Sequence, residues 1–168
     1  MGNGRISLLV DSPLRDLLVA LRAVPAEARR NVTRYTREHA EPIWFEETRD
    51  LASTRLQQRA LVNSARVGVA TRNIYLRSGG VGTLSSGTPV SDVSFGAEFG
   101  GNPQKVITQT SRKGSGKRYN RRLGNAFGAP RRGGNVVYPA ARKSIPRVAS
   151  VAIQSAYRAL LDALDGRK

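Results

Sequence analysis

Apolar residues recur at helical spacing through the first part of the chain. A first helix is predicted over residues 13–23, because Ser12 is a preferred N-cap residue and Pro13 fits the first helical position. Its apolar face carries Leu14, Leu17, Leu18 and Leu21. A second helix is predicted over residues 25–40. Pro42 is expected to break or kink this helix, and helical character then continues to an end between residues 51 and 62.

The period of the pattern changes to two from about residue 64. One long or two short strands are predicted between residues 65 and 77, and a loop rich in Gly, Ser and Pro follows over residues 79–89. A further strand is predicted over residues 93–99, because larger apolar side chains alternate there with polar or small residues. One face of this strand is expected to be buried. The alternating residues are Val93, Phe95, Ala97 and Phe99.

The end of the chain carries the strongest helical pattern. Residues 135–138 are predicted to form a short strand, and a helix is predicted from Pro139 to about Asp165. Pro146 lies inside this helix, so the helix is expected either to kink or to restart with Ser144 as its cap. One face carries Ala141, Ile145, Val148, Ala152, Ala156, Leu160 and Leu164.

The order of these elements predicts an α+β fold in a single domain over residues 1–168. A small antiparallel sheet is expected to be packed by the N-terminal helices and by the long C-terminal helix. No apolar run approaches the ~20 residues needed to cross a bilayer, so no membrane partner is expected.

Charge adds a distinct feature to this fold. The chain has 28 Lys plus Arg and 12 Asp plus Glu, a formal net charge of +16. Residues 100–134 contain basic residues, many glycines and no acid, and are predicted to form an extended loop or a β-hairpin arm. The arm is expected to bind either DNA phosphates or an acidic protein surface. Its basic residues are Lys105, Arg112, Lys113, Lys117, Arg118, Arg121, Arg122, Arg131 and Arg132.

The residue inventory disfavours catalysis. There is no cysteine, and the single histidine, His39, lies on an apolar helix stripe, where a core or interface role is favoured over a catalytic one. Two glycine-rich stretches, residues 80–85 and 114–118, depart from the phosphate-binding motifs in both residues and context. We therefore expect no enzyme activity, no cofactor, no metal site and no small-molecule substrate.

Two short segments resemble a known family. Residues 95–100 (Phe-Gly-Ala-Glu-Phe-Gly) and 137–142 (Val-Tyr-Pro-Ala-Ala-Arg) are similar to an aromatic-rich "E-F-G" element and a "P-A" helix start in neck proteins of tailed bacteriophages, of the head–tail joining or tail-completion type. The order, spacing and length of the elements are similar over almost the whole chain. Tyr138 and the long arginine-rich insertion depart from the pattern.

The resemblance implies a structural subunit of the virion, made in the host cytoplasm. It implies six copies in a ring between the head connector and the tail-terminator or tube proteins, with DNA passing through the lumen. A basic nucleic-acid-binding protein, which the net charge alone would suit, stays open as the alternative.

Overall fold

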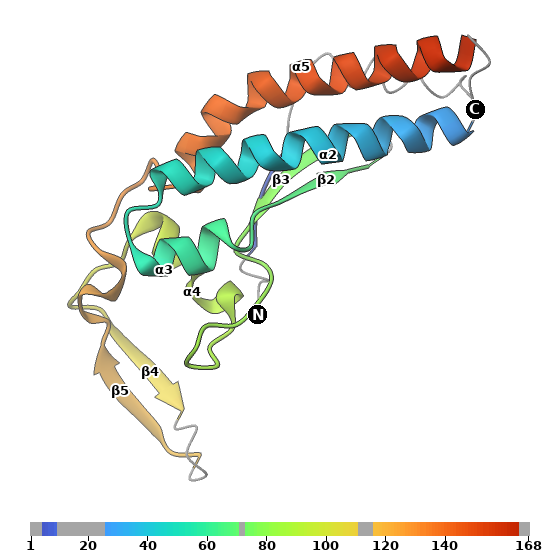
Figure 1. Ribbon diagram of the computed structural model, residues 1–168. Helices are drawn as coiled ribbons and strands as arrows, with labels where there is room; N and C mark the ends of the chain where they lie inside the picture. The colour runs from blue at the N-terminus through green and yellow to red at the C-terminus, as the bar shows by residue number, and fades with distance from the viewer. Residues whose placement is uncertain (1–4, 10–25, 71–72, 111–115, 165–168) are drawn as a thin grey trace.

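The computed structural model describes residues 5–9, 26–70, 73–110 and 116–164, and its architecture is mixed α+β, as predicted. Two long helices, α2 (Ala26–Leu51) and α5 (Val137–Leu164), run antiparallel side by side. Helix α2 lies between α5 and a small antiparallel sheet (Figure 1). A separate two-stranded hairpin projects at the opposite end of the molecule from the start of α2. The predicted helix over residues 13–23 lies outside the described residues.

The main core fills the space between the long helices and the sheet. Trp44 is fully buried on α2, and its indole Nε1–H donates to the carbonyl of Arg77 on the sheet at 3.1 Å. The predicted apolar face of α5 is confirmed, since Val148 and Ala156 are completely buried. Full burial of a large apolar side chain such as Val148 removes its surface from water and contributes about 1.5–3 kcal/mol.

Both long helices continue through an internal proline. Pro42 lies inside α2, so of the expected break or kink the break is wrong, whereas the predicted helical character beyond Pro42 is confirmed. Pro146 lies inside α5, and Ser144 does not restart that helix, because its hydroxyl donates to the Ala140 carbonyl at 2.8 Å one turn earlier. Packing between α2 and α5 holds these helices together despite the backbone hydrogen bond that each proline removes.

The three-stranded sheet has the order β1-β3-β2 and is antiparallel throughout. Strands β2 (Arg66–Val69) and β3 (Ile74–Ser78) confirm the two-strand alternative for residues 65–77. Strand β1 (Ile6–Leu9) was not predicted, and it pairs Ile6 with Ser78 on β3. Burial alternates along β3, with Ile74 and Leu76 in the core.

A short helical segment links α2 to the sheet. Helix α3 (Arg55–Gln57) begins with a capping box, in which Thr54 and Gln57 each accept a hydrogen bond from the other's backbone N–H. A π-helical turn, η2 (Gln58–Val62), follows and buries Leu61 and Val62. The end of the second helical region is thus a separate capped turn rather than a continuation of α2.

Two predicted strands are helical. Residues 93–99 belong to helix α4 (Val90–Phe99), and residues 137–138 form the first turn of α5. In α4 the fully buried positions are Val90, Ser94, Ala97 and Glu98, which follow the helical period and not the alternating one. Helix α4 ends at Gly100, whose positive φ of 74° is a backbone conformation that favours glycine.

Candidate functional site

The predicted basic arm is a β-hairpin. Strands β4 (Val106–Thr110) and β5 (Arg118–Arg122) pair antiparallel, from Val106 opposite Arg122 to Thr110 opposite Arg118. Every residue of β5 is exposed to solvent. The hairpin therefore presents its basic side chains on a regular scaffold rather than on an irregular loop (Figure 1).

The two faces of the hairpin differ. Side chains directly opposite one another in the register share a face, which places Arg118, Asn120 and Arg122 on one side. The other face carries Tyr119 and Arg121, and with Ile107 it lines an open cleft of about 860 Å³ against α4 and the loop before it. One face of the hairpin thus turns toward the body of the protein, and the more basic face turns away from it.

The base of the hairpin is closed by two backbone hydrogen bonds, and an aromatic contact joins it to the body. The Leu123 N–H donates to Lys105 O at 2.8 Å, and the Gly124 N–H donates to Pro103 O at 3.0 Å. A short 3-10 turn, η3 (Gly124–Phe127), then places the Phe127 ring against Gly96 of α4. A Cβ at Gly96 would meet the ring at 2.5 Å, so glycine is required for this close approach.

Seven of the nine predicted site residues are described, and all seven are exposed: Lys105, Lys117, Arg118, Arg121, Arg122, Arg131 and Arg132. Arg112 and Lys113 lie outside the described residues. Within the part of the chain that the structure describes, Arg147 alone forms salt bridges, with Glu46 and Glu47, so none of the seven is paired with a carboxylate. These cations are free for an anionic partner.

The two segments that carry the family resemblance meet in space at a buried carboxylate. Glu98 of α4 is completely buried, and its Oε2 accepts hydrogen bonds from the backbone N–H groups of Val136 at 3.0 Å and Val137 at 2.8 Å. Its Oε1 accepts from the Tyr138 N–H at 3.0 Å. The carboxylate therefore caps α5, where the free N–H groups and the helix dipole favour negative charge.

An aromatic row lies beside this cap. The rings of Phe95 and Phe99 have centroids 6.2 Å apart, and those of Phe99 and Tyr138 are 5.4 Å apart. Phe95 and Tyr138 are exposed. The strand prediction for residues 93–99 placed Phe95 on a buried face and is wrong on this point, because α4 turns that residue to the surface.

A second exposed apolar feature lies on α5 and was not predicted. Ile153, Tyr157 and Leu161 are spaced four residues apart and are 46%, 65% and 42% exposed. We call these three residues the α5 stripe. The stripe could have been found in the sequence, because apolar residues at i, i+4 and i+8 form a second row on this helix beside the buried one.

The single histidine is a surface residue. His39 is exposed, so a core role is wrong, and its Nδ1–H donates to Tyr35 O at 2.8 Å one turn earlier in α2. Among the described residues, no group of three His, Cys, Asp or Glu side chains could hold a metal ion.

Comparison with known proteins adds no relative. No family model, curated protein or solved structure matches the chain. In the described residues, no helix has the length and apolar character needed to cross a membrane.

Proposed function

We propose that the chain is a non-enzymatic structural subunit of a phage neck, joining the head connector to the tail. In this proposal copies of the chain form a closed ring, six in number as the resemblance implies, and the basic hairpin contacts neighbouring subunits or the DNA in the lumen. The assembled protein then lies in the virion neck after synthesis in the host cytoplasm.

The observation that carries this proposal is the presence of two unlike exposed surfaces. The hairpin is basic, and its strand β5 is exposed at every residue. The α5 stripe is apolar, and Tyr157 at its centre is 65% exposed. A closed ring with rotational symmetry needs two different surfaces on each subunit, because each copy offers one surface to the neighbour on one side and another to the next.

The composition of the α5 stripe supports contact between copies of the chain. From Val148 to Leu161 the only charged residue is Arg158, although the chain as a whole carries a net charge of +16. Two copies repel one another least where each is poor in charge. Aromatic and aliphatic side chains exposed in a row are also typical of protein interfaces.

The experiment that tests the proposal is a mass measurement by light scattering at low and high salt. We expect a discrete multiple of the 18.2 kDa chain, or a monomer that forms this ring when the adjoining neck proteins are added. The variant Arg118→Ser, Arg121→Ser, Arg122→Ser should block head–tail joining. A control with the same loss of charge, Arg49→Ser, Arg55→Ser, Arg142→Ser, should assemble normally. Normal joining by the hairpin variant would contradict the proposal.

A basic nucleic-acid-binding protein is the second candidate. Strand β5 favours it, because Tyr119 and Arg121 share one face of the hairpin, and exposed aromatic residues beside cations are typical of surfaces that stack bases and neutralise phosphates. This candidate predicts that an isolated monomer binds DNA tightly and that affinity falls steeply with salt. Such binding without any assembly would favour it over the ring.

A further inference from the structure

Charge is divided along α2. The first half of the helix carries Arg29, Arg30, Arg34 and Arg37, whereas the second half carries most of its acids. All four arginines are exposed.

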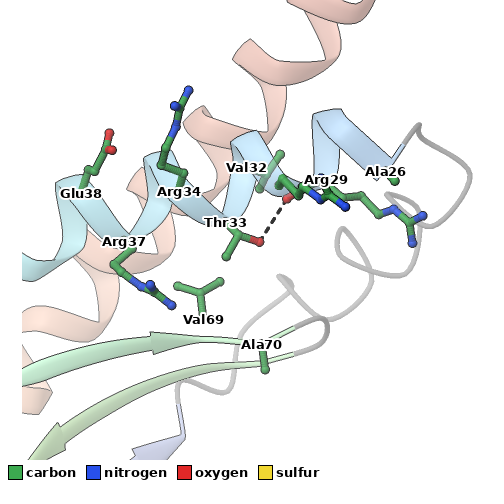
Figure 2. A pocket seen from close by; sticks show the side chains of 10 residues that line it. Ala26, Arg29, Val32, Thr33, Arg34, Arg37, Glu38, Val69 and Ala70 are labelled. Atoms are coloured by element: carbon green, nitrogen blue, oxygen red, sulfur yellow. Dashed lines mark hydrogen bonds between the residues drawn. The ribbon is translucent and has the colours of Figure 1, made fainter.

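The structure places a cleft beside these arginines. The cleft has a volume of about 640 Å³ and lies between the first half of α2 and the end of β2. Figure 2 shows Thr33 and Arg37 pointing from α2 toward Val69 and Ala70. Thr33 is held in place by its hydroxyl, which donates to Arg29 O at 3.0 Å. Arg29 and Arg30 line the same cleft nearer the start of the helix.

Two cations lie over the ring of Tyr35, between α2 and α5. The guanidinium carbon of Arg34 lies 5.1 Å from the centre of the Tyr35 ring, and that of Arg158 on α5 lies 5.7 Å from it. Contact with the electron-rich face of the ring favours these positions for the two guanidinium groups. Helix α5 therefore adds a fifth arginine to this end of the helix pair.

In the described residues none of these arginines forms a salt bridge, although Glu38 lines the same cleft. Both salt bridges there belong to Arg147, near the other end of α2. We call the set Arg29, Arg30, Arg34, Arg37 and Arg158 the arginine end. Five adjacent guanidinium groups repel one another, and an anionic ligand relieves this repulsion.

The spacing of the arginines indicates the class of ligand. Arg29 and Arg37 are separated by eight residues of helix, or about 12 Å along its axis. A single phosphate or carboxylate cannot span this distance. Each strand of duplex DNA presents one negative charge every ~3.4 Å, so its backbone places several phosphates along the same length. The planar guanidinium fork matches a phosphate with two hydrogen bonds.

We propose that the arginine end is a site for the phosphate backbone of a nucleic acid, with Arg29, Arg30 and Arg37 on the cleft side as its main contacts. The site is separate from the hairpin, which projects from the far end of the molecule (Figure 1). It does not depend on the ring, because all five arginines belong to one chain.

The test measures the affinity of the full-length chain for a duplex DNA of about 20 base pairs over a range of salt concentrations. The variant Arg29→Gln, Arg30→Gln, Arg37→Gln should lower the slope of log affinity against log salt by about 2.7, since each lost phosphate contact removes ~0.9. Affinity at about 100 mM salt should fall roughly 500-fold, which is about 2.7 log units for the one decade of salt below 1 M. The control Arg49→Gln, Arg55→Gln, Arg142→Gln removes the same charge elsewhere and should leave the slope nearly unchanged.

Three results would overturn the proposal. The first is that the unmodified chain does not bind DNA at low salt. The second is that the control variant loses as much of the salt slope as the arginine variant. The third is that poly-glutamate, at equal charge concentration, displaces the DNA. The last result would assign the arginine end to an acidic protein. The mass of the assembly, measured on the same variants, tests the ring separately. If the variant Arg29→Gln, Arg30→Gln, Arg37→Gln forms rings but no longer binds DNA, the result supports both proposals.

Discussion

At the scale of single residues, the buried carboxylate of Glu98 determines how the two halves of the chain join. It is the only fully buried acidic side chain among the described residues, and it accepts hydrogen bonds from three backbone N–H groups at the start of α5. Its own backbone carbonyl accepts two further bonds, from the N–H and the side-chain amide of Asn135, both at 2.8 Å. The burial cost of this charge is offset by charge-assisted hydrogen bonds and by the helix dipole.

Glycine at position 134 makes this arrangement possible. Gly134 has a φ of 75°, and a Cβ added there would overlap Glu98 Oε1. A side chain at this position would therefore be strained twice, by the backbone conformation and by contact with the carboxylate.

Replacing Glu98 should destabilise the fold. In Glu98→Ala three N–H groups at the buried start of α5 lose their acceptor, and we expect the free energy of unfolding to fall by about 3 kcal/mol. Glu98→Gln should also destabilise, because an amide NH₂ would then face backbone donors. Urea denaturation measures both. The control is Glu38→Ala, since Glu38 is an exposed carboxylate on α2. Equal stability of Glu98→Ala and Glu38→Ala would contradict the capping role.

At the scale of elements, the sequence predicted best where local pattern and tertiary contact agree. The apolar face of α5, the two strands of residues 65–77 and the hairpin arm all follow from local periodicity and turn residues. Helix α4 was mistaken for a strand, because Val93, Phe95, Ala97 and Phe99 alternate. The contact that favours a helix there joins Glu98 to Val136 and Tyr138, which follow it in the sequence by 38 and 40 positions. No local pattern in the sequence contains such a contact.

The same reason explains the wrong strand at residues 135–138. Val136 and Val137 are β-branched residues, which favour strands, yet their N–H groups point to the Glu98 carboxylate and begin a helix. The site was predicted in part. The cations of the hairpin were found as a run of like charge, whereas the arginine end required α5 to bring Arg158 beside Tyr35.

The hairpin should be separable from the stability of the fold. Apart from the cleft on one side, its strands β4 and β5 contact mainly each other. In a variant that replaces residues 108–120 by Asn-Gly, a two-residue type I′ turn joins the paired positions Ile107 and Arg121. We expect its free energy of unfolding to stay within about 1 kcal/mol of the unmodified chain, because exposed segments contribute little to stability. Chemical denaturation measures this.

The truncated chain also separates structure from assembly. It should fold but fail in head–tail joining, because Lys117 and Arg118 are gone and only Arg122 is left of the outward basic face. A loss of several kcal/mol on truncation would instead make the hairpin part of the folding core and would contradict its assignment as an arm for partners.

At the scale of the whole molecule, the distribution of surfaces explains how so basic a chain can assemble. Its cations gather at the hairpin and at the arginine end, which lie at opposite ends of the molecule (Figure 1). The α5 stripe carries no charge of its own. Arg158 of the arginine end follows Tyr157 of the stripe, so copies that meet through the stripe bring cations close together, and we expect phosphates or counterions at the arginine end to neutralise them in the assembly.

A single charge placed on the α5 stripe should therefore block self-association without unfolding the chain. Tyr157→Lys replaces a side chain that is 65% exposed, so the expected loss of stability is below about 1 kcal/mol. In the contact between copies, the new ammonium group would be buried without an acidic partner and would repel the basic hairpin, which costs several kcal/mol and shifts the mass measured by light scattering from ring to monomer. Val81→Lys, in the loop before α4, is the matched control, because Val81 is also 65% exposed and lies outside the stripe. Rings of unchanged mass from Tyr157→Lys would contradict the assignment of the stripe to the interface.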